Sequence, residues 1–164
     1  LPGIRCTIAN ITYRTQGLYV AKGNPKNIRS WRDFARKDIR MINREKGAGS
    51  RVLLDENLKL LNLYGSQVAG YDDENQSHLA VASAVGRGEA DVAVGTEKIA
   101  RQVENIDFVP MKKERYDLVV KTERVDTPEI KTMFEILRSS KFQNEFKSIG
   151  GYDISDIGKI IHET

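Results

Sequence analysis

The chain has 164 residues, with 26 Lys plus Arg against 23 Asp plus Glu, which gives a formal net charge of +3. Domains average roughly 150 residues, so the length predicts about one domain. The hydrophobic fraction of 40% and the charged fraction of 30% indicate a globular chain and exclude an intrinsically disordered one.

The residue types that carry metal and redox chemistry are scarce. The single cysteine, Cys6, excludes an internal disulfide and a thiol cluster for zinc. Two histidines, His78 and His162, cannot supply a histidine-rich metal site. No run approaches the roughly 18 apolar residues of a membrane helix, and the first residues lack the features of a signal peptide. We therefore expect a cytoplasmic protein with no bound metal cation and no membrane partner.

The charged residues alternate in sign, as in the stretch 114–131. Proteins that bind nucleic acids usually carry a face of one charge sign. We therefore expect no direct contact between this chain and a nucleic acid.

The first half of the chain predicts alternating strands and helices. Residues 17–21 are expected to form a strand, residues 31–37 a short helix and residues 39–43 a buried strand. A glycine loop at 47–49 then leads into a helix over 51–63, in which leucines recur at helical spacing.

The second half continues this alternation. Residues 78–85 predict a helix of small residues. Strands are expected at 91–95, 106–109 and 116–121. Two further helices are expected after Thr127, an N-cap that is followed by proline at the first helical position. Strands separated by helices of roughly 10 to 15 residues imply β-α-β units. The chain is therefore predicted to be an α/β protein with a mainly parallel sheet and flanking helices.

The segment Asn43–Arg51 is the first candidate binding site. It joins a predicted strand to a predicted helix, and its glycines allow backbone N–H groups to point into one concavity. A helix N-terminus carries about half a positive charge, so free amides there favour an anion. Ser50 adds a hydroxyl donor, while Arg44 and Arg51 can add charge. A tight turn with a capping serine is the alternative, and this segment alone leaves it open.

Two nucleotide-binding motifs fit this loop poorly. A P-loop requires Gly-x-x-x-x-Gly-Lys-Ser/Thr, but the first glycine and the lysine are missing, and Arg51 follows Ser50. A dinucleotide-binding loop requires a small residue where Val52 stands. Asp72 and Asp73 follow the loop at about the sequence distance of the acidic residue that contacts the ribose in such sites. The strand that should precede them, however, is only weakly indicated by the sequence.

The segment Glu74–His78 is the second candidate, because it also precedes a predicted helix. Ser77 could present a hydroxyl and amides to a ligand, or it could simply cap the helix. His78 has no evident serine or cysteine nucleophile to activate, and no Gly-x-Ser-x-Gly elbow is present. Two such loops at the ends of parallel strands fit a crevice for a small anion, without catalytic machinery.

Several segments also carry a family pattern. They are residues 14–18, 23–26, 43–44, 47–55, 77–82, 88–91 and 114–119. Together they resemble the periplasmic-binding-protein-like (type II) domain of the molybdate- or tungstate-binding kind. In bacteria and archaea that domain is found fused to molybdopterin-biosynthesis enzymes or to helix-turn-helix DNA-binding domains. The resemblance covers about residues 11–158.

This resemblance implies two lobes that are joined by two crossing strands, with an oxyanion held in the cleft. The crossing strands would be residues 17–21 and 116–121. Residues 22–115 would form one complete lobe, while 1–21 and 116–164 would supply the crossing strands and part of the second lobe.

The resemblance also implies which residues bind the oxyanion. Ser50 and Ser77 would donate hydroxyl hydrogen bonds, and the amides of Gly49, Ser50 and His78 would help. The residues expected near the hinge, where they would close over the ligand, are Arg14, Gln16 and Tyr116.

The chain departs from the family in two ways. The family loop reads Gly-Ser-Gly-Thr-Arg, but here Ala48 and Ser50 stand at its second and fourth positions. Ser50 keeps a hydroxyl, whereas Ala48 removes one donor. A stretch that normally precedes the first crossing strand is also missing. We therefore expect a fragment of a longer protein, with a site that is only partly built.

The function expected from the resemblance is noncatalytic binding of molybdate or tungstate, with no further cofactor. The domain would serve sensing or delivery in molybdenum-cofactor metabolism, beside a fused biosynthetic or DNA-binding domain. The alternative is an effector-binding module of a transcriptional regulator. A homodimer is a further expectation, because an incomplete lobe leaves sheet edges and apolar faces exposed.

Overall fold

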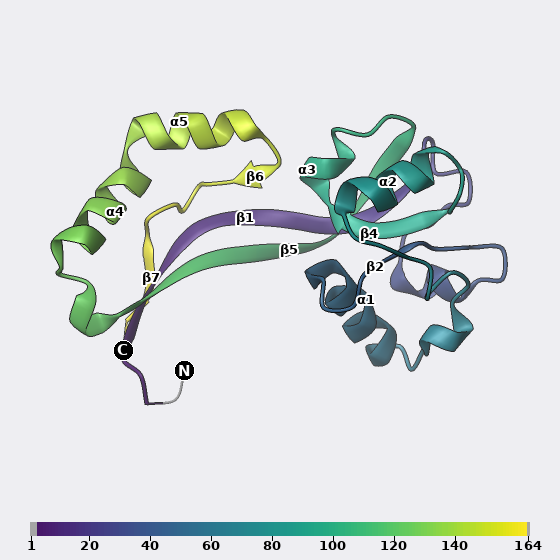
Figure 1. The fold of residues 1–164 in the computed structure, drawn as a ribbon, viewed down its shortest axis with the longest axis horizontal. Coiled ribbons are helices and arrows are strands. Elements are labelled where there is room, and N and C mark those ends of the chain that lie inside the picture. Colours follow the sequence, from purple (N-terminus) through teal and green to yellow (C-terminus); the bar gives the residue numbers. More distant parts are fainter. Residues whose placement is uncertain (1–2, 164) are drawn as a thin grey trace. The chain divides into compact units, whose positions relative to one another are not determined.

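The computed structural model describes residues 3–163, and the chain divides into two compact units. The central unit is Thr15–Lys112, and the terminal unit combines the described residues 3–14 and 113–163. Two strands of 16 residues each, β1 (Cys6–Ala21) and β5 (Ile106–Lys121), contribute to both units (Figure 1, purple and green). The chain therefore enters the central unit along β1 and leaves it along β5.

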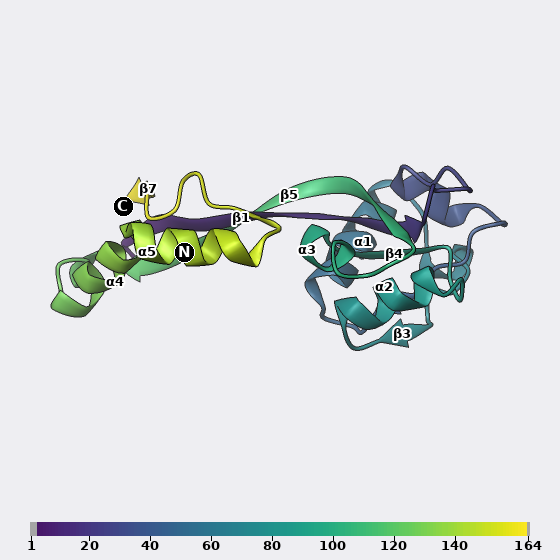
Figure 2. The same cartoon turned by 90° about the horizontal axis from the view of Figure 1, so that it is seen from above.

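The central unit alternates short strands with helices, as Figure 2 shows from above. After β1 its elements are, in chain order, a 3-10 helix (Trp31–Ala35), β2 (Asn43–Arg44), α1 (Gly49–Leu60), a second 3-10 helix (Gly65–Gln67), β3 (Glu74–Asn75), α2 (His78–Gly86), β4 (Val92–Thr96) and α3 (Glu97–Ala100).

The strands of the central unit run in the order β3-β2-β4-β1-β5. β2 pairs in parallel with β3, and Arg44 lies opposite Asn75. A parallel bridge joins Met41, just before β2, to Val92 of β4. β4 then pairs antiparallel with β1, so that Gln16 lies opposite Thr96. The carboxyl ends of β2, β3 and β4 therefore meet at one edge of the unit.

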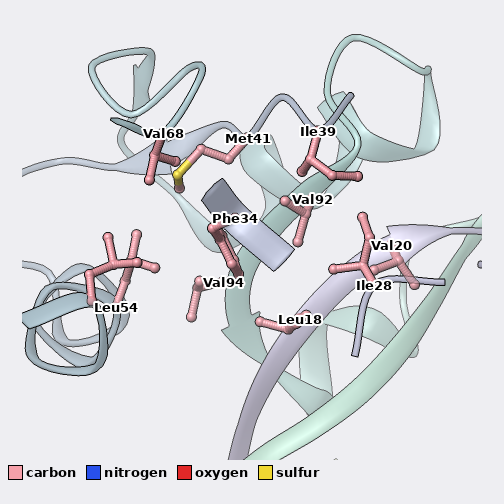
Figure 3. Packing of buried hydrophobic residues seen from close by; sticks show 11 residues of the cluster. Leu18, Val20, Ile28, Phe34, Ile39, Met41, Leu54, Val68, Val92 and Val94 are labelled. Carbon is pink, nitrogen blue, oxygen red and sulfur yellow. The ribbon is translucent and has the colours of Figure 1, made fainter. Parts of the chain in front are cut away.

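Strands β1 and β4 are buried on both faces because their side chains alternate between two apolar clusters. One cluster contains Leu18 and Val94 together with Leu54 of α1. The other contains Tyr19 and Ala93 with the buried face of α2. The first cluster gathers around Phe34, which is fully buried (Figure 3). Its buried members are Leu18, Val20, Ile28, Phe34, Ile39, Met41, Leu54, Leu58, Val68, Val92 and Val94.

The terminal unit packs two helices against the remaining halves of β1 and β5. Its elements after β5 are a 3-10 helix (Thr122–Arg124), α4 (Pro128–Arg138), α5 (Ser140–Ile149), β6 (Tyr152–Asp153) and β7 (Ile160–Glu163). β6 and β7 both pair antiparallel with β1, with Thr7 opposite Glu163. The core here consists of Ala9, Phe134, Leu137, Ile154 and Ile157.

The α/β class predicted from the sequence is confirmed, but one detail of the sheet is wrong. The pairs that β1 makes with β4, β6 and β7 are all antiparallel. Parallel pairing is found between β2 and β3 and at the Met41–Val92 bridge. The sheet is therefore mixed rather than mainly parallel. The β-α-β pattern holds locally, whereas β1 returns through the unit in the opposite direction.

Four predicted elements also differ from the structure. Residues 106–109 and 116–121 belong to one strand, β5, because Pro110 lies on a strand whose only neighbour in the described sheet is β1. Proline is tolerated on such an edge. The helix predicted at 31–37 is a 3-10 helix of five residues, and the strand predicted at 39–43 is reduced to β2 and the Met41 bridge.

Among residues 3–163, no helix combines the length and apolar character that a membrane span requires.

Candidate functional site

The candidate site is the edge of the central unit where β2, β3 and β4 end, called the carboxyl edge here. α1 begins at Gly49, a short loop after β2, and α2 begins at His78, two residues after β3. Because β2 and β3 are parallel neighbours, both helices start at this same edge. Each helix N-terminus presents backbone N–H groups that have no partner within the helix.

Ser50 lies in the first turn of α1 and is buried, with 1% of its surface exposed. Its Oγ has no hydrogen-bond partner in the structure. The N-cap residue of this helix is Ala48, whose side chain cannot accept from the first amides. A buried hydroxyl without a partner costs free energy. The start of α1 therefore holds an unused hydroxyl beside uncapped amides.

Ser77 is the N-cap of α2, and its Oγ accepts a hydrogen bond of 3.0 Å from the Ala80 N–H. The capping role that the sequence suggested is thus confirmed. Accepting this bond leaves the hydroxyl hydrogen free to donate elsewhere. Ser77 is exposed and His78 is half-buried, so both can be reached at the start of α2.

Arg44, the last residue of β2, has a side chain that is only 10% exposed. Its Nε and Nη2 donate to the two carboxylate oxygens of Glu45, each at 2.8 Å. Nη2 also donates to the carbonyl of Gln76 at 3.2 Å, which ties β2 to the loop before α2. The hydrogen bonds from Arg44 are the main cause that lowers the pKa of Glu45.

Arg51, one residue after Ser50, is 3% exposed and surrounded by acceptors. Its Nε donates to Asp55 at 3.2 Å, and its Nη1 donates to Glu74 at 3.0 Å and to the Arg44 carbonyl at 3.2 Å. Its guanidinium carbon lies 4.1 Å from the centre of the Tyr71 ring. These contacts fix Arg51 against its own unit, and its predicted role towards an anion stays a prediction.

Gln16 lies at the same edge because it is opposite Thr96, the last residue of β4. Both side chains are buried. Beside them the Tyr19 hydroxyl donates to the Thr96 carbonyl at 2.9 Å. Burial raises the pKa of Tyr19 to about 12, although the positive charge of Arg44 acts in the opposite direction.

The two remaining predicted residues, Arg14 and Tyr116, belong to the terminal unit. Arg14 stacks over the Tyr116 ring at 4.5 Å and donates to Glu114 at 2.9 Å. The structure thus places seven of the nine predicted residues in the central unit, at or next to its carboxyl edge. They are Gln16, Arg44, Gly49, Ser50, Arg51, Ser77 and His78.

Sequence reasoning missed Glu45 and Thr96 at this edge. Thr96 could have been found, because it directly follows the strand predicted at 91–95, whose carboxyl end points the same way as that of β2. Glu45 follows Arg44 directly, but neighbouring residues of opposite charge are common, and nothing in the sequence predicts a bidentate pair. Within the described part of the chain, no group of three or more His, Cys, Asp or Glu side chains is placed to hold a metal ion.

A family model described as PBP superfamily domain matches residues 1–138. The chain belongs to this family. The family and the two-unit fold agree with the resemblance noted in the sequence. Among proteins of this fold is the substrate-binding domain of a molybdenum ABC transporter from Clostridium difficile. It is 20% identical, with a TM-score of 0.58, over 89% of this chain and 66% of that one. At this identity the likeness shows the fold, which is that of a substrate-binding domain.

Two sequence relatives are closer in identity. The uncharacterized protein YvgK of Bacillus subtilis (strain 168) is 44% identical over 166 residues, which cover 100% of this chain and 52% of YvgK. An uncharacterized protein from the 5′ region of a 2Fe-2S ferredoxin gene of Clostridium pasteurianum is 49% identical over 112 residues. That alignment covers 68% of this chain and 99% of the relative. This PBP superfamily domain therefore spans about half the length of YvgK.

Proposed function

We propose that the carboxyl edge of the central unit binds a small tetrahedral oxyanion, molybdate or tungstate, without catalysis. The observation that carries this proposal is the Ser50 hydroxyl, which is buried at the start of α1 and has no partner within the protein. A ligand oxygen would accept from that hydroxyl and from the uncapped amides of Gly49 and Ser50. Ser77 and the first amides of α2 lie at the same edge and would supply the other side.

The charges at the edge favour an anion held by neutral donors. Arg44 and Arg51 are both paired with carboxylates of the chain, so no excess of positive charge surrounds the helix starts. Hydroxyl and amide donors suit an oxyanion whose oxygens all accept. Phosphate near neutral pH keeps a proton on one oxygen. That P–O–H group would face the hydroxyl and amide donors of the site and could not accept from them through its proton. The proposal therefore includes a preference for molybdate and tungstate over phosphate.

The wider role proposed is sensing or delivery of the anion in molybdenum-cofactor metabolism, in the cytoplasm. The substrate-binding domain of the molybdenum ABC transporter with this fold supports the choice of anion. YvgK is about twice as long as this chain, which leaves room for a fused biosynthetic or DNA-binding domain. The second candidate is an effector module, in which anion binding shifts an attached DNA-binding domain. The rest of the protein's sequence distinguishes the two.

Calorimetry on the full-length protein tests the binding proposal. Molybdate and tungstate should bind measurably, and phosphate should bind at least about tenfold more weakly, which corresponds to roughly 1.4 kcal/mol. Ser50→Ala should weaken molybdate binding by about five- to tenfold, because one hydrogen bond to a charged ligand is lost. Ser66→Ala, at an exposed serine of the same unit, is the matched control and should bind like the wild type. The proposal fails if none of the tetrahedral oxyanions binds.

A further inference from the structure

The guanidinium of Arg44 lies at the carboxyl edge, beside the loop that leads into α2. It donates to the Gln76 carbonyl, one residue before the N-cap of α2. With a side chain only 10% exposed, Arg44 is a strong and largely desolvated donor for any anion at this edge.

Glu45 already occupies this donor in the way that an oxyanion would. Its two oxygens accept from Nε and Nη2 of Arg44 in a bidentate pair, both at 2.8 Å. Planar, two-pronged contacts of this kind are how arginine binds carboxylates and phosphates. Glu45 is also the first residue of the loop that leads to Ser50.

The two arginines of the edge differ in how tightly their partners hold them. Arg51 contacts two carboxylates, a carbonyl and an aromatic ring, and its side chain is 3% exposed. Arg44 has one carboxylate partner, Glu45, and that side chain is 39% exposed. The Glu45 carboxylate can therefore swing into water by side-chain rotation, whereas Arg51 cannot be released without disrupting packed groups.

We propose that Glu45 determines the affinity of the anion site by acting as an internal competitor for Arg44. The inference rests on the proposed function and adds one charged donor, Arg44, to the neutral donors named there. In the structure Glu45 holds the guanidinium. A tetrahedral dianion displaces the carboxylate, takes over Arg44 together with the Ser50 hydroxyl, and leaves Glu45 in solvent.

Displacement has a consequence for the strength of binding. Every dianion that gains Arg44 must first break the bidentate pair, so Glu45 raises the concentration at which the site fills. The chain thus carries a built-in lower limit on the anion concentration to which it responds.

The test is tungstate binding to full-length Glu45→Gln, measured by calorimetry. The matched control is Glu56→Gln, which makes the same charge change at an exposed position of α1. Glu45→Gln should bind tungstate about tenfold more tightly than the wild type, since a neutral amide holds Arg44 less strongly than a carboxylate. Glu56→Gln should stay within about twofold of the wild type. Equal affinities of the two variants would overturn the proposal.

Two further measurements separate displacement from simple charge repulsion. In an Arg44→Gln background the effect of Glu45→Gln should vanish, whereas repulsion would persist without the arginine. If Arg44→Gln does not fold, a crystal structure of the tungstate-loaded wild type decides instead. Arg44 should then contact the anion and Glu45 should have left it, and an intact Arg44–Glu45 pair beside bound tungstate would refute displacement. If Glu45→Gln binds tungstate with the same affinity as the wild type, this inference alone is refuted. If neither the wild type nor the variant binds any tetrahedral oxyanion, the proposed function is refuted as well.

Discussion

At the scale of single residues, Ser50 combines a cost in stability with a proposed use. Its hydroxyl is buried at the first turn of α1 without a hydrogen-bond partner. An unsatisfied buried hydroxyl destabilises the folded state by about 1 to 3 kcal/mol. A serine that served only packing would be replaced by alanine with a gain. Replacing Ser50 by alanine should therefore raise the stability of the fold and weaken the binding of the ligand.

We expect Ser50→Ala to raise the free energy of unfolding of the ligand-free protein by about 1 kcal/mol. Urea unfolding followed by the fluorescence of Trp31 measures this, because Trp31 is the only tryptophan and lies in the central unit. Ser66→Ala, at an exposed site, should stay within about 0.5 kcal/mol of the wild type. A loss of stability in Ser50→Ala would mean that its hydroxyl has a partner inside the protein.

Arg51→Lys should destabilise the central unit by about 2 to 4 kcal/mol, because lysine cannot keep the fork of contacts to Asp55 and Glu74 or the stacking on Tyr71. The same urea experiment measures the change. Its control is Arg87→Lys, at a surface pair with Glu89 in which both side chains are more than half exposed. That variant should change stability by less than about 0.5 kcal/mol. Similar losses in both variants would contradict a special role for the buried contacts of Arg51.

The serines of the site could be predicted from the sequence, since each stands where a loop turns into a helix. The partners of the arginines could not. Arg51 contacts Glu74, which is distant in the chain, and this contact depends on the parallel pairing of β2 with β3. Nonlocal pairing of short strands leaves no periodic signal in the sequence. The free charge expected for Arg44 and Arg51 is therefore matched by carboxylates, and the fold alone brings Glu74 close to Arg51.

At the scale of elements, α1 shows what the spacing of apolar residues in the sequence can predict. Its leucines at helical spacing predict one buried face, and Leu54 and Leu58 are indeed buried. Apolar residues at helical spacing likewise predicted α4 and α5, whereas α2 was predicted from its run of small residues. β5 was split into two predicted strands because Pro110 and the charged residues after it interrupt the apolar pattern. An edge strand tolerates both, and whether a strand is at an edge is a property of the sheet.

The two faces of α1 give a matched pair of substitutions. Leu54→Ala should reduce the free energy of unfolding by about 2 to 5 kcal/mol, because a fully buried leucine leaves a cavity in the cluster of Figure 3. Leu60→Ala, in the same helix but 80% exposed, should change it by less than about 0.5 kcal/mol. Denaturant melts of both variants measure the difference. Equal effects would show that the two leucines are not on opposite faces of α1.

At the scale of the whole molecule, acid stability depends on an ion pair that crosses β1 in the terminal unit. Lys113 of β5 reaches over the Tyr13 ring, at 4.4 Å, to donate to Asp153 of β6 at 2.7 Å. This bond and the backbone N–H of Ser155 lower the pKa of Asp153 to about 2. A carboxyl whose pKa is lower in the folded state contributes stability above its unfolded pKa, and that contribution disappears as the pH falls through its folded pKa.

Asp153→Asn should therefore be less stable than the wild type at pH 6, and the difference should shrink between about pH 4 and pH 2. The loss at pH 6 should be below about 1 kcal/mol, because the pair is exposed and screened by solvent. Thermal melts followed by far-ultraviolet circular dichroism measure it. Asp126→Asn, at a side chain that is 92% exposed, controls for the change in net charge. A difference that is independent of pH would contradict the contribution of Asp153.

Because the terminal unit combines residues from both ends of the chain, the two units are completed at different times during synthesis. The central unit is complete once Lys112 has been made. The beginning of β1 has to wait, because Thr7 pairs with Glu163, near the other end of the described chain. At about 5 to 20 residues per second, the residues Thr7–Ala9 of β1 spend on the order of ten seconds without their partner β7. β1 is thus made before the other elements of this chain, yet its beginning is among the last parts of the fold to be completed.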